Sequence, residues 1–300
     1  MNTKITIAGV IFKNPVMTAS GTFGSGMEYA EFVDLNCLGA VVTKGVANVP
    51  WEGNPTPRVQ ETYGGMLNAI GLQNPGIDVF IERDIPFLKQ YDTNIIVNVC
   101  GRSVSDYVEV VEKLADQPVD MLEINVSCPN VKHGGIAFGQ DPKCLFDITK
   151  EIKVKAKQPI IMKLSPNVTD ITEMAKAAEA AGSDAISLIN TITGMKIDIN
   201  KRTFALANKT GGLSGPAIKP VAVRMVYQAA NAVKVPIIGM GGIACAEDAI
   251  EFLLAGATGI AVGAMNFVNP YTTVEVIKGI EEYMRQYDIE ELTDIIGSVK

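Results

Sequence analysis

Short apolar runs recur along the chain and alternate with longer segments of helical period. We predict eight strands from these runs, at residues 15–19, 38–44, 94–100, 119–125, 159–164, 184–189, 235–240 and 258–262. The runs are apolar on both faces, as expected for parallel strands that are buried between helices. Eight strand–helix units predict an α/β protein that closes as a (β/α)8 TIM barrel. A doubly wound open sheet is the alternative, and the number of strands favours the barrel.

Helical periods and turn residues fit this arrangement. The predicted helices include residues 106–114, 171–181, 217–233 and 246–254, and Gly182 and Gly256 mark the ends of two of them. Residues 5–12 alternate between apolar and polar positions and turn at Gly9. This pattern predicts a small N-terminal hairpin that could plug one end of the barrel.

The spacing of the strands predicts long insertions after strands 2, 4 and 6. Loops that follow barrel strands lie on the catalytic rim, so these insertions should close over a ligand from three sides. Residues 45–75, in the first insertion, are rich in Pro, Gly and Asn and have no long periodic segment. We interpret them as a functional loop in which residues 68–72 are ordered over the ligand. The part around Trp51 is a candidate partner or dimer surface.

Composition limits the number of domains, the partners and the location. With 300 residues and 47% hydrophobic content, we expect a single domain over residues 1–300. The net charge of -7 gives no basic footprint for nucleic acid or anionic lipid. No run is long enough to span a membrane, and the N-terminus does not resemble a signal peptide, so we expect a cytoplasmic protein.

The cysteines are odd in number and scattered. They are Cys37, Cys100, Cys128, Cys144 and Cys245, and none forms a CxxC pair. This argues against a disulfide framework and against a metal or iron-sulfur cluster held by this chain. We expect Cys37, Cys100 and Cys245 to be inert, buried thiols. Cys144 lies early in a predicted helix, where a thiolate could be stabilised, but we favour a packing role for it. Cys128 follows strand 4 directly and precedes a glycine-rich loop. This position is typical of a reactive group that a movable loop covers.

Polar residues gather where the strands end. They are Ser20, Lys44, Asn98, Asn125, Cys128, Lys163, Asn190 and Thr191. Polar groups inside a barrel need partners, because burying an unpaired amide or ammonium is costly. A ligand rich in hydrogen-bond acceptors would supply them, and the alternative is that these residues pair with one another.

The ends of strands 7 and 8 are rich in glycine, at residues 239–243 and 262–265, and residues 211–217 add a third glycine-rich segment. Backbone N–H groups after these two strands commonly hold a phosphate in barrels. A phosphate with two lysines nearby suits flavin mononucleotide (FMN). Lys163 would stabilise the negative charge that grows on the reduced flavin, and the alternative for Lys163 is an ion pair inside the barrel.

Several motifs in order resemble the soluble first family of dihydroorotate dehydrogenases. The match runs essentially end to end through Ala19-Ser20-Gly21, Thr43-Lys44-Gly45, residues 54–58, residues 68–74, Asn125-Val126-Ser127-Cys128-Pro129-Asn130 and the glycine pairs. The resemblance implies an FMN-binding barrel that oxidises dihydroorotate to orotate in pyrimidine synthesis. Residues 132–139 resemble the type B catalytic subunit.

The resemblance also assigns residues. It places Ser20, Lys44, Gly45, Asn98, Asn125, Lys163, Ile189, Gly215, Gly241, Gly242, Gly263 and Ala264 around the flavin. It places Lys44, Asn68, Ala69, Ile70, Gly71, Leu72, Asn125, Asn190 and Thr191 around the substrate. Cys128 is the implied catalytic base, and the only histidine, His133, is expected to be a solvated loop residue. No metal is expected in this chain.

Type B implies a partner subunit that carries FAD and a [2Fe-2S] cluster, with NAD as the final acceptor and a homodimer within a heterotetramer. One alternative is a homodimer that uses fumarate without a second subunit. Another is a flavin-free lyase or aldolase that binds a sugar phosphate and uses Lys163 or Lys44 as a Schiff base. A third is a non-catalytic binding barrel, in which the polar rim would be incidental.

Overall fold

The computed structural model of the chain describes residues 1–127 and 138–299. The barrel strands are β3 (Val16–Thr18), β4 (Ala40–Val42), β7 (Asn94–Val99), β8 (Met121–Asn125), β9 (Ile160–Lys163), β10 (Ala185–Leu188), β15 (Ile237–Met240) and β16 (Gly259–Val262). They are parallel and close in the order β10-β15-β16-β3-β4-β7-β8-β9. The predicted (β/α)8 TIM barrel is therefore confirmed, and each predicted run contains one barrel strand.

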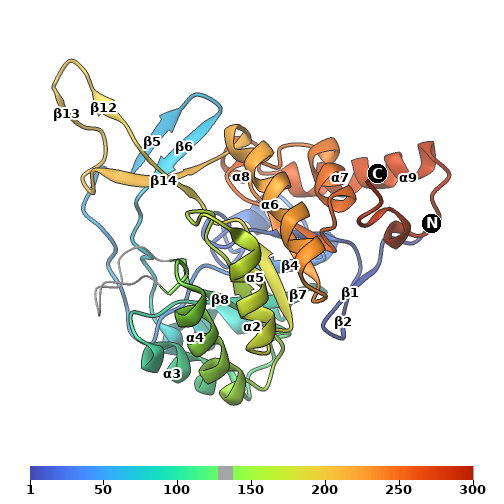
Figure 1. The fold of residues 1–300 in the computed structure, drawn as a ribbon, viewed down its shortest axis with the longest axis horizontal. Helices are drawn as coiled ribbons and strands as arrows, with labels where there is room; N and C mark the ends of the chain where they lie inside the picture. The colour runs from blue at the N-terminus through green and yellow to red at the C-terminus, as the bar shows by residue number, and fades with distance from the viewer. Residues whose placement is uncertain (128–137, 300) are drawn as a thin grey trace.

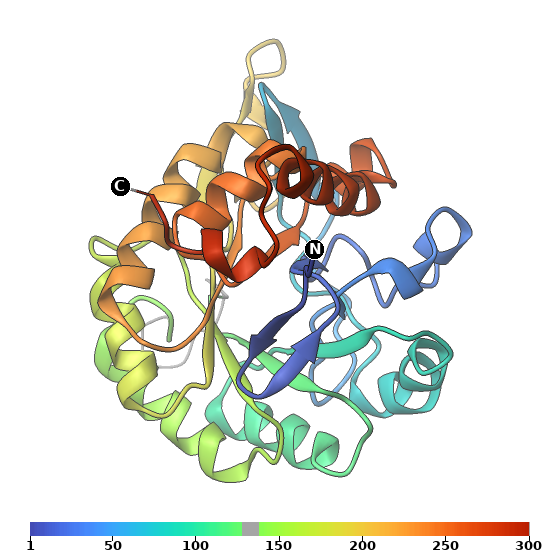
Figure 2. The ribbon, with the colours of Figure 1, turned by 90° about the vertical axis from the view of Figure 1, so that its right-hand side faces the viewer.

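Helices cover the outside of the barrel (Figures 1 and 2). The longer ones are α3 (Val104–Leu114), α4 (Pro142–Lys155), α5 (Ile171–Ala180), α6 (Lys219–Ala232), α7 (Ala246–Leu254) and α9 (Thr272–Gln286). The short ones are α1 (Ile77–Val79), α2 (Ile85–Leu88) and α8 (Met265–Val268). Side-chain caps fix several starts: Ser103 and Asp106 form a capping box on α3, and Asp141 and Asp170 cap α4 and α5. Among the described residues, no helix is long and apolar enough to cross a membrane.

An N-terminal hairpin closes the amino end of the barrel. It consists of β1 (Ile5–Ile7) and β2 (Val10–Phe12), which pair antiparallel around Ala8 and Gly9. Both turn residues have positive φ, as the tightest hairpin turns require. Ile5 and Ile7 pack beside Gly259, the first residue of β16. The hairpin lies across this end of the barrel in Figure 2, as the alternating pattern predicted.

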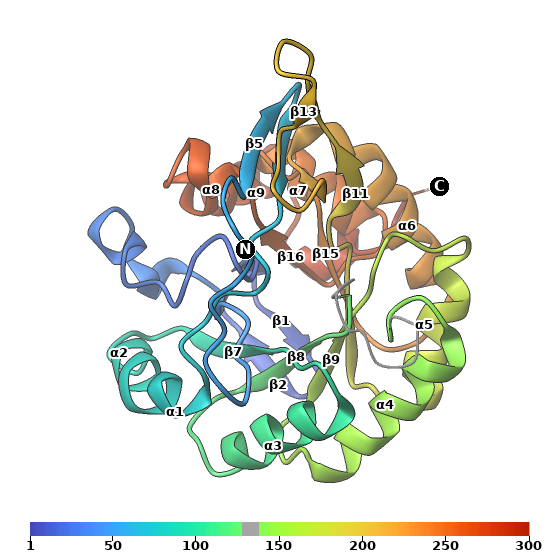
Figure 3. The same cartoon turned by 90° about the vertical axis from the view of Figure 1, so that its left-hand side faces the viewer.

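A second sheet stands over the opposite end (Figures 1 and 3). It combines β5 (Val59–Thr62) and β6 (Gly65–Asn68) from the insertion after β4 with β11 (Ile192–Met195) and β14 (Thr210–Ser214) from the insertion after β10. The order is β11-β14-β6-β5, and a further pair, β12 (Ile197–Asp198) and β13 (Thr203–Phe204), extends from it. Residues 45–75 are therefore not an irregular loop throughout, because the hairpin β5-β6 finds its partner strand in the other insertion.

Candidate active site

A cavity of about 1160 Å³ opens at the carboxyl ends of the barrel strands, below the second sheet. This exceeds the range of about 300–1,000 Å³ that is usual for one small ligand, so the cavity has room for a cofactor and a substrate together. The predicted flavin and substrate residues that are described all line it, namely Ser20, Lys44, Gly45, Asn68, Ala69, Ile70, Gly71, Leu72, Asn98, Asn125, Lys163, Ile189, Asn190, Thr191, Gly215, Gly241, Gly242, Gly263 and Ala264. The fold thus brings together residues from every part of the chain, while their individual roles stay predictions.

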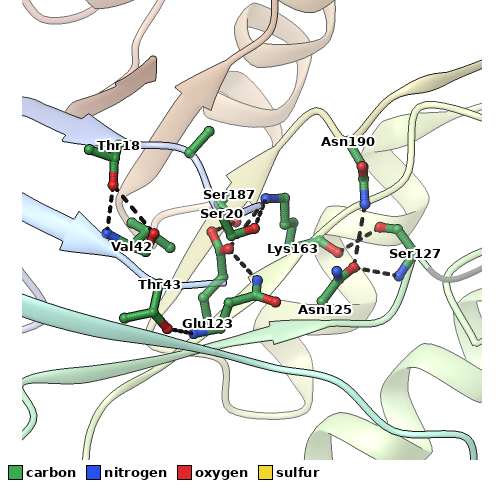
Figure 4. Close-up of polar contacts among 12 residues, drawn as sticks. Thr18, Ser20, Val42, Thr43, Glu123, Asn125, Ser127, Lys163, Ser187 and Asn190 are labelled. Atoms are coloured by element: carbon green, nitrogen blue, oxygen red, sulfur yellow. Dashed lines mark hydrogen bonds and ion pairs between the residues drawn. The ribbon is translucent and has the colours of Figure 1, made fainter. Parts of the chain in front are cut away.

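Lys163 lies at the floor of this cavity, at the end of β9. Its ammonium donates to Ser20 Oγ over 3.0 Å and lies 3.3 Å from Glu123 Oε1 (Figure 4). The expected alternative, an ion pair inside the barrel, is therefore present. It does not remove Lys163 from the site, because the side chain still lines the cavity.

Glu123, beneath the cavity floor, is one of the residues that the sequence interpretation missed. It is 1% exposed and accepts hydrogen bonds from Asn98 Nδ2 over 2.6 Å and from Ser187 Oγ over 2.8 Å, besides its contact with Lys163. The signal was available, because Glu123 is the only charged residue within the apolar strand Met121–Asn125. A carboxylate there needs buried donors, and the neighbouring strands supply them.

Two groups at the cavity floor lack partners in the described part of the chain. Asn98 Oδ1 is buried and accepts no hydrogen bond there, and it faces Gly45, where a Cβ would come within 2.9 Å of it. The Lys44 ammonium has no salt bridge or hydrogen bond with any described residue. Burial lowers the pKa of Lys44; the Cys100 thiol opposes this shift, and the Arg58 and Lys163 cations add to it. A ligand that offers an N–H or O–H donor to Asn98 Oδ1 and an acceptor or anionic group to Lys44 would satisfy both groups.

The glycine-rich segments converge at another part of the cavity. Gly215, Gly241 and Gly242 all have positive φ, and a Cβ on Gly242 would lie 2.8 Å from the carbonyl oxygen of Gly215. The N–H groups of Gly241, Gly242, Gly263 and Ala264 donate no hydrogen bond within residues 1–127 and 138–299. Unpaired backbone donors beside a cavity are suited to a phosphate.

Amides line the side of the cavity nearest β8 and β10. Asn125 Oδ1 accepts from Ser127 N over 3.3 Å and from Asn190 Nδ2 over 3.4 Å. These contacts turn the amide nitrogen of Asn125 away from its neighbours, where it can donate to a ligand. The Tyr107 hydroxyl, which donates to the Asn125 carbonyl over 2.8 Å, anchors the strand end from below.

Residues 68–72 are held in place over the cavity, as predicted for an ordered segment. Asn54 N donates to the Ile70 carbonyl over 3.0 Å, and Asn54 Nδ2 donates to the Ala69 carbonyl over 2.9 Å. Asn68 Nδ2 reaches the Gly212 carbonyl of the second insertion over 3.4 Å. The two insertions therefore meet directly at the predicted substrate residues.

Ser165 and Asn167, which follow β9, also line the cavity and were not predicted. Asn167 Nδ2 donates to the Thr191 carbonyl over 3.1 Å, and Asn167 Oδ1 accepts from Thr193 N over 2.9 Å. The side chain therefore fixes the segment that carries Thr191. Its position just after a barrel strand was the signal that could have found it.

Cys128 and His133, for which the sequence predicts a catalytic base and a solvated loop residue, lie outside the described residues. Of the cysteines expected to be buried, Cys100 is buried, but Cys37 and Cys245 are exposed, so that expectation was wrong for these two. Cys37 ends a surface turn and Cys245 begins α7. Burial and the neighbouring Asp141 raise the pKa of Cys144, which disfavours a thiolate there.

The Trp51 side chain itself is not exposed, although Val49, Pro50 and Glu52 beside it are, so the partner or dimer surface around Trp51 stays a prediction. Trp51 is 7% exposed and packs with Ala47, Cys100 and Leu72. The Arg102 guanidinium lies over its ring, 4.5 Å from the ring centre. Burial of this large apolar ring is favourable, and through these contacts the indole anchors the insertion to the barrel.

The donor set fits a flavin phosphate and ring. The cavity combines four unpaired N–H groups at one part with two lysines, a buried amide oxygen and several amides at another. Within the described residues, no three His, Cys, Asp or Glu side chains gather as metal ligands would. The organic cofactor predicted from the sequence therefore has suitable contacts.

The chain is similar to known proteins along its whole length. Residues 2–284 match the family model described as dihydroorotate dehydrogenase. A relative from Lachnoclostridium phytofermentans, named dihydroorotate dehydrogenase B (NAD(+)), catalytic subunit, is 74% identical over 300 residues and 100% of both chains. Relatives of the same name from Alkaliphilus metalliredigens and Thermoanaerobacter pseudethanolicus are 67% and 57% identical, over 100% of this chain and 99% of theirs.

Proposed function

The chain belongs to the dihydroorotate dehydrogenase family, and from this premise we propose that it oxidises (S)-dihydroorotate to orotate in pyrimidine biosynthesis as a catalytic subunit of the NAD-linked type B. The observation that carries the proposal is that a single cavity contains both sets of groups. The unpaired backbone N–H groups that suit a phosphate line one part of it, and the amides and lysines line another. The first set suits a nucleotide cofactor and the second suits orotate, whose ring carries imide carbonyls, N–H groups and a carboxylate.

FMN is the proposed cofactor of this chain. The N–H groups of Gly241, Gly242, Gly263 and Ala264 would hold its phosphate, and Ser20, Lys44, Gly45, Asn98, Asn125, Lys163, Ile189 and Gly215 would surround the rest of it. When bound, a flavin supplies the acceptor for the substrate hydride. The contribution of this chain is to bind and orient: Lys163 places a cation at the cavity floor, and Asn98 offers its unpaired amide oxygen.

The proposed substrate contacts lie around the amides. Asn68, Asn125 and Asn190 can donate to carbonyl oxygens, and Lys44 can pair with a carboxylate, which would relieve the cost of its burial. Residues 69–72 and Thr191 complete the wall on this side. Because the amide of Asn125 is oriented by Ser127 and Asn190, its hydrogen-bond donor is set before a ligand arrives.

Cys128 is the proposed base. It follows β8 by a few residues, after Ser127, whose hydroxyl donates to the Lys163 carbonyl over 3.1 Å. A thiolate at this end of the barrel would take the proton from the carbon beside the substrate carbonyl, while the hydride leaves the adjacent carbon. A well-placed base typically contributes about 100- to 10,000-fold to the rate.

A partner subunit is implied by the names of the relatives, which are called catalytic subunits. We propose that this partner carries FAD and a [2Fe-2S] cluster and passes the electrons to NAD, in a heterotetramer built on a dimer of this chain. The alternative is a homodimer that reduces fumarate alone. Assays of the isolated chain and of the co-purified complex, with fumarate and with NAD, separate the two.

The spectrum of the purified protein tests the proposed reaction itself. We expect flavin absorbance bands that bleach on anaerobic addition of dihydroorotate, with one orotate formed for each flavin reduced. A colourless protein would instead favour the lyase. In that case borohydride should trap a covalent adduct between a sugar phosphate and Lys44 or Lys163, by reducing their Schiff base. Flavin bands that dihydroorotate does not bleach would contradict the substrate assignment.

A further inference from the structure

Glu123 is a buried carboxylate that the proposed chemistry does not use. Its oxygens face three donors from three other barrel strands: Asn98 from β7, Lys163 from β9 and Ser187 from β10. Figure 4 shows Glu123 among Ser187, Ser20 and Lys163. A buried carboxylate is costly unless it is paired and hydrogen-bonded, so its presence at this level of the barrel calls for a reason beyond packing.

The carboxylate lies below the cavity wall, while two of its partners form that wall. Asn98 and Lys163 line the cavity, whereas Glu123 and Ser187 do not. One oxygen, Oε1, accepts both the Asn98 amide at 2.6 Å and the Lys163 ammonium at 3.3 Å, and Oε2 takes the Ser187 hydroxyl. Glu123 can therefore act on a bound ring through the position and the charge of these two side chains.

The charges at the floor set the direction of this effect. Lys44 and Lys163 are the two lysines that line the cavity, and only Lys163 has an anionic partner in the described chain. A reduced flavin carries more negative charge than an oxidised one, so an uncompensated cation beside it favours reduction. A carboxylate that offsets the cation works in the opposite direction.

We propose that Glu123 is a positioning residue that sets the reduction potential of the flavin: it holds Asn98 and Lys163 against the cavity floor and offsets the charge of the Lys163 ammonium. This inference rests on the proposed FMN site. It assigns no contact between Glu123 and substrate or cofactor. On this proposal, the buried Glu123 carboxylate lowers the reduction potential of the flavin, so that the reduced flavin can still pass its electrons to the next acceptor.

Glu123→Gln is the direct test, because it removes the charge and little else. The amide oxygen of a glutamine can still accept from Asn98 and Lys163, and the Ser187 hydroxyl can turn to accept from the amide nitrogen. We expect the flavin to become easier to reduce by about tenfold or more in the equilibrium constant near neutral pH. For a two-electron couple, tenfold corresponds to about 30 mV upward. The potential is measured by spectroelectrochemical titration.

Three further variants give the prediction its controls. Lys163→Met should lower the potential, and Glu123→Gln combined with Lys163→Met should bring it back toward the wild-type value, since both charges are then gone. Asp84→Asn removes another buried carboxylate, one that accepts from Ser25 Oγ and pairs with Arg83 away from the cavity, and it should leave the potential unchanged. If Glu123→Gln alone does not fold with flavin, the same carboxylate can be tested in the Lys163→Met background. The difference in flavin potential between Lys163→Met and the double variant then measures the effect of removing the Glu123 charge.

The outcomes separate this inference from the proposed function. A wild-type protein whose flavin is reduced by dihydroorotate, with variants at Glu123 that match the Asp84→Asn control in potential, would overturn only the role of Glu123. A purely structural role would weaken flavin binding or thermal stability and leave the potential where it was. A wild-type protein that binds no flavin would overturn both.

Discussion

The amide nitrogen of Asn190 lies 3.4 Å from Asn125 Oδ1, which joins the ends of two barrel strands, β10 and β8, that are not neighbours. Ser127 N donates to the same oxygen over 3.3 Å. The oxygen of Asn125 is therefore committed within the protein, and its amide nitrogen is left for a ligand. The contacts therefore fix which atom of the Asn125 amide can bind a ligand, and substitutions at single residues can test its contribution.

Asn125→Asp should weaken orotate binding strongly. The substitution removes the donor and adds a negative charge beside an anionic ligand. A hydrogen bond that involves a charged group contributes about 1.5–3 kcal/mol, which corresponds to about 10- to 150-fold in affinity. The measurement is the Kd of orotate, followed through the flavin spectrum. Asn48→Asp, which adds the same charge outside the cavity, should bind orotate as the wild type does, and equal Kd values for the two variants would refute the prediction.

Lys44→Met should stabilise the flavin-depleted protein while it weakens substrate binding. Burial lowers the pKa of Lys44, so the folded state disfavours the charged form relative to the unfolded state. The resulting cost is fully present below the folded pKa and disappears as pH rises toward the unfolded value of about 10.5. We expect the variant to melt higher by about 2–4 °C for each kcal/mol relieved, and the gain should shrink at alkaline pH. A lower melting temperature at neutral pH would show that Lys44 is not penalised by burial.

Gly212→Ala should disturb the predicted substrate residue Thr191. A Cβ at position 212 would lie 1.9 Å from Thr191 Oγ1, so the threonine has to move. Overpacking of this kind costs about 1–3 kcal/mol, and we expect KM for dihydroorotate to rise about tenfold with flavin retained.

Gly194→Ala in the neighbouring strand β11 is the matched control for this substitution. Its closest neighbour would be the flexible end of Leu67, at 3.1 Å, so the added methyl group can be accommodated. A control that raises KM as much as Gly212→Ala does would mean that any added methyl group in this sheet disturbs the site.

Much of the fold and of the cavity follows from local patterns in the sequence. The barrel strands are buried on both sides, so each reads as an apolar run, and a residue such as Lys163 or Asn98 within such a run marks the interior. The carboxyl ends of parallel strands meet at one rim, so the sequence alone predicts that residues far apart along the chain lie together there. The family resemblance is likewise confirmed by the full-length matches.

The remaining features depend on contacts that no local pattern encodes. The second sheet forms because Asn68 pairs with Gly212 across two insertions, and the glycine-rich strand Thr210–Ser214 has few of the residues that favour strands. Trp51 and Cys37 show the same limit, since their burial is decided by distant packing rather than by neighbours in sequence. Glu123 was missed for another reason: its place as the one acidic residue in an apolar strand marks it as unusual, but its role depends on donors from other strands, which the local sequence does not identify.

The rate of flavin reduction by dihydroorotate in a Cys128→Ala variant, measured by stopped flow in a single turnover, tests the proposed reaction most directly. We expect the variant to keep its flavin and to be reduced about 100- to 10,000-fold more slowly than the wild type. A rate within a few-fold of the wild-type value would contradict the proposal that a thiol after the fourth barrel strand removes the substrate proton.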